Sequence, residues 1–345
     1  MSAPAPSVFS ELAQQYIHRL GLAPGVPNLD AYSRTLIDLA SKDPRIVVVT
    51  SDSRGSGKLT PFGEKFPDRH IEVGIAEQNL VGIAAGLAAV GKKPFATSPS
   101  SFLTARAVEQ IKNDVCYSDV PVVLVGISAG VSYGALGSTH HSLHDIALLR
   151  AISNITIIVP ADNVETEKAV RAAAQAEHPV FLRFGKAPMY TLHSENVDFK
   201  PGRAIRIRDG NDIAFIATGE VVVHCLLAAA YLEEYGVKAR VVSMHTIKPL
   251  DIDEILAAGK SCRAVITVEE HSVHGGLGEA VAAVLLQAGI CVPYYIVGIP
   301  DEETVTGSQA DIFRHYGLTM ESLAEKALLL LGESVGILSH QVGSK

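Results

Sequence analysis

The sequence predicts an α/β protein of two doubly wound domains, each with a mainly parallel sheet covered by helices. Short runs rich in valine and isoleucine alternate with segments of helical periodicity along most of the chain. This alternation is typical of parallel sheets, because the crossover between two parallel strands is usually a helix. The 345 residues also exceed what one hydrophobic core usually spans, and the periodicity fails between Lys186 and Gly210.

Five strands and five helices are expected before that break. The apolar runs RIVVVTS, KPFATS, PVVLVGIS, ITIIVPA and PVFLRFG predict the strands. Helical periodicity predicts helices at about 29–42, 74–91, 103–117, 142–151 and 163–177. Asp162 or Asn163 is suited to cap the last of these helices, since acidic residues follow in its first turn.

A second alternating unit follows the break. Strands are expected near DIAFIATG, ARVVSMHT, AVITVEE and YYIVGIP, with helices near 220–235, 251–259, 277–288 and 320–331. We therefore divide the chain into an N-terminal arm (1–27), a first domain (28–190), a linker (191–210) and a second domain (211–345). The leading alanine, proline and serine residues of the arm are expected to be loose.

Composition and charge argue against several classes of protein. The net charge of −8 and the pI near 5.9 argue against nucleic acid or an anionic membrane as a partner. The N-terminus lacks the pattern of a secretory signal, and no apolar run reaches membrane-spanning length. The scattered cysteines, without CxxC spacing, indicate reduced thiols of a cytoplasmic protein and no metal site. GxGxxG after the first strand, GxxxxGK[ST] and HExxH are absent.

Glu77 stands at the start of an expected helix whose other residues are almost all apolar. Such a helix is buried on most sides, and a carboxylate there is costly unless it is paired, hydrogen-bonded or protonated. No cationic residue follows before Lys92. The plainer alternative is a first-turn glutamate stabilised by the helix dipole. We favour a functional role, because the first turn leads directly into LVGIAAGLAAV.

Two further segments carry candidate residues. Phe102 follows a strand through Pro99, at the sheet edge where ligands bind in open parallel sheets, so its ring is a candidate to stack on a flat ligand. The alternative is a core phenylalanine. His140 and His141 follow a glycine-rich stretch before a helix. Adjacent histidines rarely point at one spot, so a single acid, base or hydrogen-bond donor is favoured over a metal site, with a merely solvated histidine as the alternative.

Several segments, taken in order, resemble the transketolase family, specifically its pyrimidine-binding domain followed by its C-terminal domain. They are EVGIAEQNLVGIAAGLAAVGKKPF, SSFLTARAVEQIKND, GSTHHSLHDIALLRAI, VPADNVETEKAV and TIKPLD…VEEH…GGLG. The match runs from about residue 28 to the end. The chain is similar, more loosely, to 1-deoxyxylulose-5-phosphate synthase and to the β subunits of 2-oxo acid dehydrogenases.

This resemblance implies thiamine diphosphate as the cofactor and assigns roles to particular residues. Glu77 matches the glutamate that hydrogen-bonds N1′ of the aminopyrimidine, and Phe102 the ring that stacks on it. His140 matches the histidine that contacts substrate near C2 of the cofactor, and we class it with Glu77 as catalytic. The remaining positions implied are Ile75 and Pro99 for the cofactor, and Asp52, Ser56, His141 and Arg183, with His140, for the substrate.

The resemblance also implies that half of the enzyme lies elsewhere. The family binds the diphosphate through Mg2+ held by a GDG…N motif in an N-terminal domain, and this chain contains no GDG. We therefore expect the C-terminal subunit of a split transferase, without a metal site of its own. A partner subunit would carry Mg2+ and the diphosphate site, and self-association through the pyrimidine domain would give a cytoplasmic heterotetramer. The chain alone should be inactive.

Departures from the family pattern indicate an unusual sugar substrate. The family's GEDG reads GALG here, which places Leu136 at the position of a sugar-binding aspartate, and Ser128 replaces a histidine. Pro99 replaces an aromatic residue, and Arg34 is out of register with an expected arginine. SPSSFL…SYGALG…HHS most resembles the split transketolases of apulose 4-phosphate breakdown, which pass a two-carbon ketol unit to an aldose phosphate such as glyceraldehyde 3-phosphate. The alternatives are a 6-deoxy-6-sulfofructose or ordinary pentose-phosphate split transketolase, an oxo-acid dehydrogenase β subunit, or a silent partner subunit. Retention of Glu77 favours catalysis.

Overall fold

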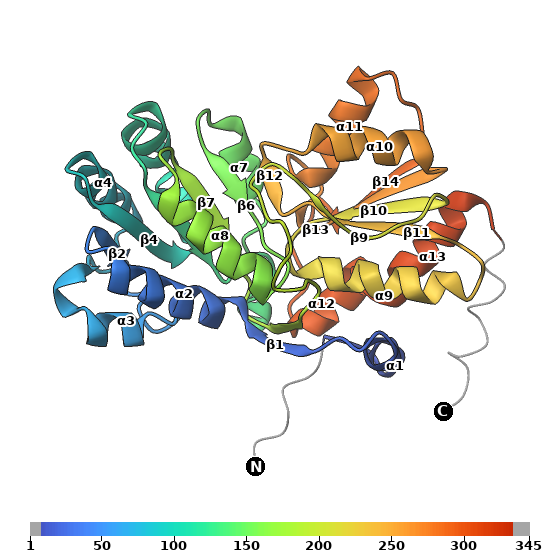
Figure 1. The fold of residues 1–345 in the computed structure, drawn as a ribbon, viewed down its shortest axis with the longest axis horizontal. Helices are drawn as coiled ribbons and strands as arrows, with labels where there is room; N and C mark the ends of the chain where they lie inside the picture. The colour runs from blue at the N-terminus through green and yellow to red at the C-terminus, as the bar shows by residue number, and fades with distance from the viewer. Residues whose placement is uncertain (1–7, 334–345) are drawn as a thin grey trace, which may run out of the picture.

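The computed structural model describes residues 8–333, which form two large sheets with helices on both faces of each (Figure 1). The seven-stranded sheet has the order β12-β6-β7-β5-β4-β2-β3, and the five-stranded sheet has the order β14-β13-β10-β11-β9. All neighbouring strands in the first sheet are parallel except β12 and β6, and all in the second except β9 and β11. The prediction of an α/β fold with mainly parallel sheets is confirmed.

The strands of the larger sheet follow the predicted apolar runs, with two additions. They are β2 (Ile46–Thr50), β3 (His70–Glu72), β4 (Lys93–Pro99), β5 (Val123–Ile127), β6 (Thr156–Ile158), β7 (Val180–Arg183) and β12 (Thr246–Lys248). Every residue of β2, β5 and β7 is buried, as expected of central strands covered on both faces. The sequence pattern did not predict β3 or β12, which have three residues each and no continuous apolar run.

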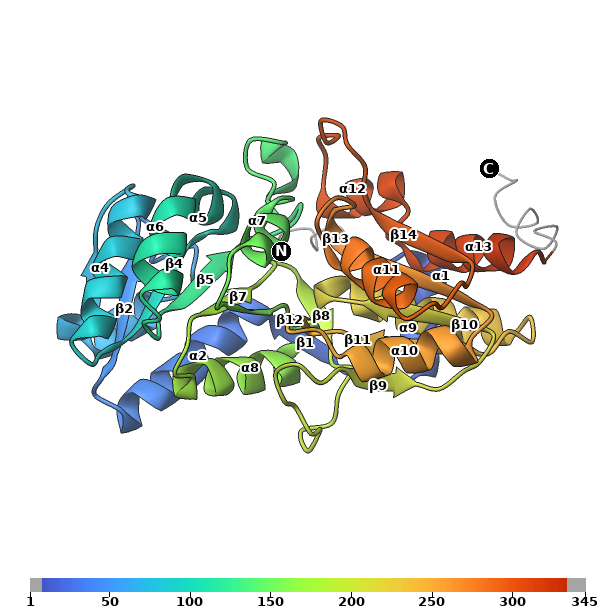
Figure 2. The ribbon, with the colours of Figure 1, turned by 90° about the horizontal axis from the view of Figure 1, so that it is seen from above.

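Helices cover both faces of this sheet, and Figure 2 shows α4 to α7 on one side and α2 and α8 on the other. The elements are α2 (Asn28–Lys42), α3 (Thr60–Lys65), α4 (Glu77–Ala89), α5 (Ser100–Arg106), α6 (Val108–Gln110), α7 (Asp145–Ala151) and α8 (Asn163–Gln175). Asp162 caps α8 as predicted, because its side chain accepts a hydrogen bond from the backbone N–H of Glu165.

Two predicted helices were wrong in detail. The single helix expected at 103–117 is divided into α5, α6 and a π-helical segment, Ile111–Tyr117. Thr104 donates its hydroxyl proton to the carbonyl of Ser100 at 2.8 Å, a side-chain bond of the kind that bends helices, and α5 ends two residues later. The helix expected from 142 begins only at Asp145, because Ser142 forms a β-bridge with Gly130.

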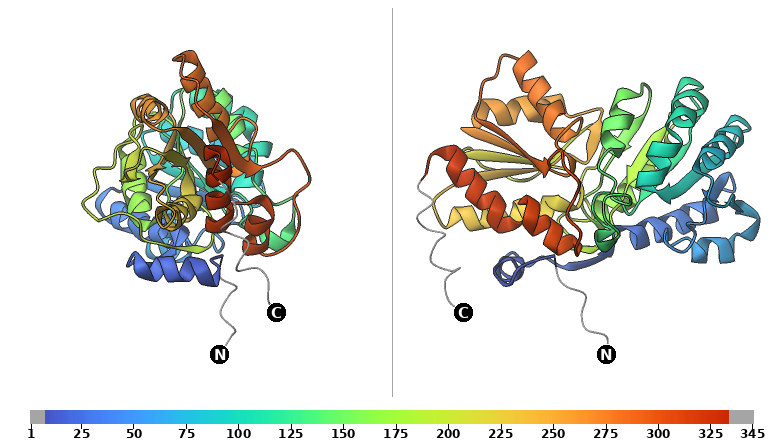
Figure 3. Two further views of the ribbon diagram at one scale, coloured as in Figure 1. Left: turned by 90° about the vertical axis from the view of Figure 1, so that its right-hand side faces the viewer. Right: turned by 180° about the vertical axis from the view of Figure 1, so that it is seen from behind.

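The second sheet and its helices follow the predicted order, except that β9 was not predicted and lies within the segment expected to be a linker. The strands are β9 (Ile205–Arg208), β10 (Ile213–Ala217), β11 (Ala239–Ser243), β13 (Ala264–Ser272) and β14 (Tyr294–Ile299). The helices are α9 (Val222–Glu233), α10 (Ile252–Ser261), α11 (Leu277–Gln287), α12 (Gln309–Tyr316) and α13 (Met320–Leu331). Figure 3 shows α10 and α11 on one face of the sheet and α9 and α13 on the other. The unpredicted α12 begins with a reciprocal capping box between Ser308 and Asp311.

The segment predicted as an N-terminal arm is ordered in its described part. Helix α1 (Glu11–Arg19) buries Ala13, Tyr16 and Ile17 against α9, and the ring of Tyr16 meets that of Tyr231 edge-on at 5.6 Å. Strand β1 (Pro24–Pro27) then pairs antiparallel with β8 (Pro188–Tyr190). Residues 8–27 are therefore part of the folded body, since α1 has an apolar face that the composition-based prediction overlooked. The leading residues expected to be loose lie outside the described residues.

The two halves of the chain share one packed interior. Strand β12 comes from the second half of the sequence but extends the first sheet by pairing with β6. One apolar cluster also joins Leu80 and Ala84 of α4 with Val242, Ile255 and Leu277 of the second unit. The division into two domains at residues 191–210 stays a prediction. Strand β12 follows that segment in the sequence but belongs to the first sheet. Within residues 8–333, no helix combines the length and apolar character that crossing a bilayer requires.

We predict that replacing Ile17 with alanine will destabilise the protein by about 2–5 kcal/mol, because the substitution leaves a cavity between α1 and α9. Urea denaturation of the purified chain would measure this loss. The matched control is Gln15→Ala, an exposed position on the same helix that should change the free energy of unfolding little. Equal midpoints for the Ile17→Ala variant and the wild type would show that α1 contributes nothing to the fold.

Candidate active site

The candidate residues gather where β2, β4 and β5 end. The carboxyl ends of parallel strands meet at one edge of a sheet, which is where open α/β sheets bind ligands. Asp52 and Ser128, each just past a strand end, have φ angles of 53° and 54°, in the left-handed region that non-glycine residues seldom adopt. Backbone strain of this kind clusters at functional sites. This edge is therefore the candidate active site.

Glu77 is buried at this edge and forms an ion pair. Its side chain is only 3% exposed, although it is the first residue of α4. Arg106, the last residue of α5, donates from Nη1 to both carboxylate oxygens, at 3.0 Å to Oε2 and 3.2 Å to Oε1. The sequence-based prediction found no cation near Glu77 because it searched only along α4. The two residues are 29 positions apart and meet through the fold.

Aromatic and cationic side chains form a row beside this ion pair. The guanidinium of Arg106 lies over the ring of Phe102, 4.5 Å from the centroid. That ring meets the imidazole of His140 edge-on at 5.3 Å, and His140 meets Tyr133 in the same way at 5.5 Å. Phe102 is half-buried, so it is not a fully enclosed core residue. The structure thus brings Glu77, Phe102 and His140 together, and adds Arg106 and Tyr133, which the sequence-based prediction had missed.

The two adjacent histidines have different surroundings. His140 is half-buried, with Nδ1 3.0 Å from the hydroxyl of Thr139. His141 is buried, with Nδ1 2.6 Å from the hydroxyl of Thr304 and Nε2 3.0 Å from the carbonyl of Gly134. Burial lowers the pKa of His141 below its usual range. His141 anchors its loop to the second unit, so its role in substrate binding stays a prediction that the burial does not support.

Four further predicted residues lie at the rim. Asp52 is exposed, and its backbone N–H donates to Glu72 at 2.7 Å. Ser56 is exposed and donates to the carbonyl of Ser53 at 3.2 Å. Pro99 is half-buried at the end of β4, and Ile75 is 74% exposed two residues before Glu77. Their predicted roles stay predictions, but all except Pro99 have side chains open to a partner or ligand.

Arg183 lies beneath the site in a buried ion pair. It donates from Nε to Asp145 at 2.9 Å, and from Nη2 to the carbonyls of Ser142 and Glu270 at 3.0 and 2.9 Å. Burial alone would raise the pKa of Asp145, but Arg183, His271 and a hydrogen bond from Ser100 lower it to about 2. The resemblance had implied that Arg183 binds the substrate. That role stays a prediction, and its engagement inside the protein counts against it.

Buried acids near Arg183 form a cluster that the sequence-based prediction also missed. Burial, with the nearby Glu270, raises the pKa of Glu220 to about 8, and burial raises those of Glu269 and Glu270 to about 7. Glu220 accepts a hydrogen bond from Asn28 at 3.2 Å. It also packs so tightly on Gly185 that a Cβ there would lie 2.0 Å from Oε2. A glutamate in a strand-to-helix turn gives no sequence signal of such burial.

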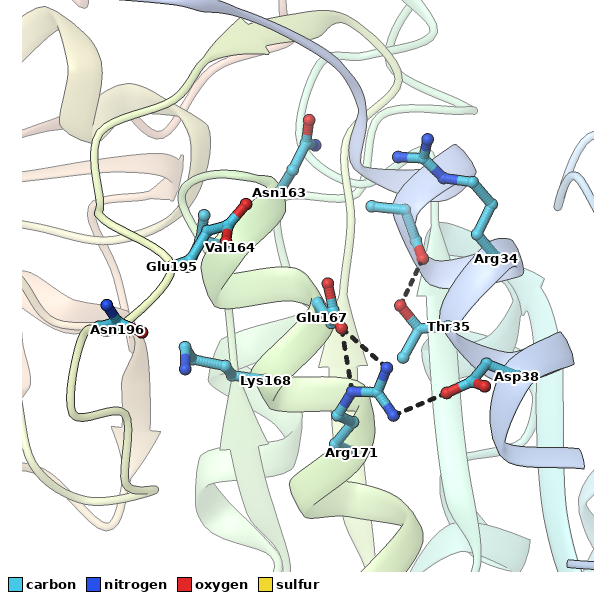
Figure 4. Close-up of a pocket in the computed structure, with 11 residues that line it drawn as sticks. Arg34, Thr35, Asp38, Asn163, Val164, Glu167, Lys168, Arg171, Glu195 and Asn196 are labelled. Carbon is cyan, nitrogen blue, oxygen red and sulfur yellow. Dashed lines mark hydrogen bonds and ion pairs between the residues drawn. The ribbon is translucent and has the colours of Figure 1, made fainter. Parts of the chain in front are cut away.

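A large polar cavity, of about 700 Å³, lies elsewhere, between α2, α8 and residues 195–196 (Figure 4). It is on the face of the sheet opposite α4, and three of its charged side chains form ion pairs, since Arg171 donates to both Asp38 and Glu167. Arg34 lines this cavity rather than the candidate site. Within residues 8–333, no group of three His, Cys, Asp or Glu side chains is arranged to hold a metal ion.

Comparison with known families defines the class of the protein. The profile described as "Transketolase, pyrimidine binding domain" matches residues 25–190, and that described as "Transketolase, C-terminal domain" matches residues 202–323. These matches confirm the resemblance seen in the sequence. Members of this class depend on thiamine diphosphate.

Individual relatives agree with this class. The chain is 44% identical to one of the subunits of apulose-4-phosphate transketolase from Phocaeicola vulgatus, over 86% of this chain and 95% of that protein. It is 36% identical to a 6-deoxy-6-sulfo-D-fructose transketolase subunit of a Clostridium species, over 86% and 92%. A solved split-gene transketolase, an inactive β4 tetramer, superposes with a TM-score of 0.80 at 37% identity, over 89% and 99%. The chain therefore belongs to the transketolase family.

We predict that the free energy of unfolding will fall as the pH rises from about 4.5 to about 8. The folded protein keeps Glu220 protonated in this range, whereas the unfolded chain, with an ordinary pKa of 4.5, releases that proton. Above pH 8 both states are ionised, and this contribution levels off. In the Glu220→Gln variant this position cannot titrate. Its free energy of unfolding, measured by urea denaturation across this range, should therefore fall less than that of the wild type.

The control is Glu325→Gln, an exposed glutamate on α13 that should leave the pH profile unchanged. If Glu220→Gln and the wild type lose stability equally between pH 4.5 and 8, then Glu220 does not stay protonated in the folded protein.

Proposed function

We propose that this chain is the C-terminal subunit of a split, thiamine-diphosphate-dependent transketolase. Together with a partner it transfers a two-carbon ketol unit from a ketose to an aldose phosphate such as glyceraldehyde 3-phosphate. The observation that carries the proposal is the buried Glu77 beside Phe102 and His140, in a chain that covers 95% of a split-transketolase subunit. A silent subunit with the same fold would have no use for a buried carboxylate at this edge.

The residues at the sheet edge fit an aminopyrimidine ring. A planar, hydrogen-donating guanidinium reaches both the Glu77 carboxylate and the face of Phe102, so a planar group has access to both. We assign Glu77 to share a proton with the pyrimidine nitrogen N1′, and Phe102 to stack on the ring. The cofactor, when bound, supplies the electron sink for breaking and making the carbon–carbon bond. The half-buried imidazole of His140, at the edge of the Phe102 ring, hydrogen-bonds the substrate oxygens.

The rest of the site belongs to a partner subunit in this proposal. The absence of GDG from the sequence supports placing Mg2+ and the diphosphate on that partner. Two copies of this chain would associate through their pyrimidine domains, giving a cytoplasmic heterotetramer. The C-terminal part of α4 supports this, because Gly86 and Val90, the residue just after the helix, are exposed, and a Cβ added at Gly82 or Gly86 would meet nothing within 4 Å. The inactive tetramer of the split-gene relative is consistent with self-association without a partner.

The substrate we favour is apulose 4-phosphate, with 6-deoxy-6-sulfofructose as the second candidate. Leu136 is 54% exposed in the loop that carries His140, so it presents an apolar surface where an aspartate would bind a sugar hydroxyl. This change in the residues expected to line the substrate channel argues against xylulose 5-phosphate as the donor. The two relatives named above act on these two ketoses by name, and the more similar of them is the apulose-4-phosphate enzyme.

We predict that Glu77→Gln will abolish ketol transfer by the reconstituted complex, by at least about a hundredfold, while the complex still assembles. Transfer to glyceraldehyde 3-phosphate would be measured with apulose 4-phosphate, 6-deoxy-6-sulfofructose and xylulose 5-phosphate as donors, and assembly by size-exclusion chromatography. Glu109→Gln, an exposed glutamate on α6, is the matched control and should retain activity. Near wild-type turnover by the Glu77→Gln complex would refute the catalytic assignment.

We also predict that the isolated chain will not bind thiamine diphosphate, with or without Mg2+, because it holds only the pyrimidine side of the site. Isothermal titration calorimetry should show binding once an N-terminal transketolase subunit from the same organism is added. Tight, Mg2+-dependent binding by the chain alone would contradict a site divided between two subunits.

A further inference from the structure

One guanidinium makes both contacts that the proposed function assigns to the aminopyrimidine. Arg106 donates to both oxygens of Glu77, and it also lies over the ring of Phe102. The first contact is the hydrogen bond expected from the ring nitrogen, and the second is the stacking expected on the ring face. A guanidinium resembles an aminopyrimidine in the features that matter here, since both are planar, delocalised and edged with N–H donors.

The two groups cannot occupy this place together. Nη1 of Arg106 lies within 3.2 Å of each Glu77 oxygen, and Cζ of the same guanidinium lies 4.5 Å from the centroid of the Phe102 ring. A second planar group would have to enter the same space. The pairing also places a cation against the carboxylate that the proposed function assigns to the pyrimidine nitrogen.

Arg106 has room to leave. Its side chain is 51% exposed, whereas that of Glu77 is 3% exposed, so the cation can turn into solvent while the acid stays in place. It is the last residue of α5, beside the break at Ala107, where the helix gives way to α6. Exchange is therefore possible, because the cation is already half in water and returns to it when another donor takes its place on Glu77.

We propose that Arg106 is a stand-in for the aminopyrimidine, one that satisfies the buried Glu77 until the cofactor displaces it. This inference rests on the proposed function. Displacing Arg106 weakens cofactor binding, since only the fraction of molecules with Arg106 turned away can bind the cofactor. It also explains how a chain without cofactor keeps a buried acid at the edge of its sheet. The alternative is that Arg106 stays in place and helps to hold the cofactor.

The affinity of the reconstituted complex for thiamine diphosphate distinguishes these possibilities. At saturating Mg2+, Arg106→Ala should lower the Kd by about three- to tenfold, because the ion pair and the cation–π contact no longer compete. Lys112→Ala removes an exposed positive charge six residues further on and is the matched control. Its Kd should stay at the wild-type value or rise, since cations favour the anionic cofactor.

A weaker or unchanged Kd for Arg106→Ala, in a complex whose wild type binds thiamine diphosphate, would overturn this inference alone. Failure of the wild-type complex to bind the cofactor would overturn the proposed function, and this inference with it. If Arg106→Ala does not fold, Arg106→Met keeps the length of the side chain without its charge and should tighten binding in the same direction.

A double-mutant cycle of Glu77→Gln and Arg106→Ala provides a second readout that needs no activity. Urea denaturation of the cofactor-free chain should reveal coupling between the two residues, with Arg106→Ala destabilising the wild type more than the Glu77→Gln variant. The coupling should disappear in the complex saturated with thiamine diphosphate. Coupling of equal size in both states would show that Arg106 never leaves Glu77, and would overturn the proposal.

Discussion

The buried pair of Arg183 and Asp145 fixes the geometry on which the site depends. Asp145 accepts hydrogen bonds from Ser100 at 2.6 Å and from Ser142 at 2.9 Å, while Arg183 donates to the main chain of β13. Ser100 opens the helix that carries Phe102, and Ser142 ends the loop that carries His140. A buried ion pair adds little net stability, because removing two charges from water costs about as much as their attraction returns. Here the pair fixes positions instead, since the same two side chains hold both the helix that carries Phe102 and the loop that carries His140.

Several buried carboxyl groups lie close to the Arg183–Asp145 pair, where the two units of the chain pack together. Glu269 accepts hydrogen bonds from the N–H groups of Leu277 and Gly278 at the start of α11, and Glu270 accepts one from Val131. Each acid satisfies backbone donors that would otherwise be buried without partners, Glu269 within the second unit and Glu270 across the contact between the two units. The cluster thus joins loops of the first unit to the helices of the second, and the two units act as one support for the sheet edge.

Local patterns were enough to predict most of the fold and part of the site. Apolar runs predicted the central strands, Asp162 marked the start of α8, and the apolar sequence around Glu77 predicted its burial. The sequence could not place Arg106 against Glu77, or β12 against β6, because those contacts join segments far apart in the chain. The burial of Glu220 likewise depends on Gly185 and Asn28, which no periodicity links to it.

The crossing of β12 into the first sheet has a consequence for how the chain is made. During synthesis, β6 and its neighbours emerge from the ribosome well before Thr246–Lys248, and until then one side of β6 has no strand to pair with. An unpaired strand edge invites pairing with other chains. During synthesis the first sheet is therefore exposed for a time to pairing with other chains through β6. This exposure ends only when β12, from the second unit, pairs with β6.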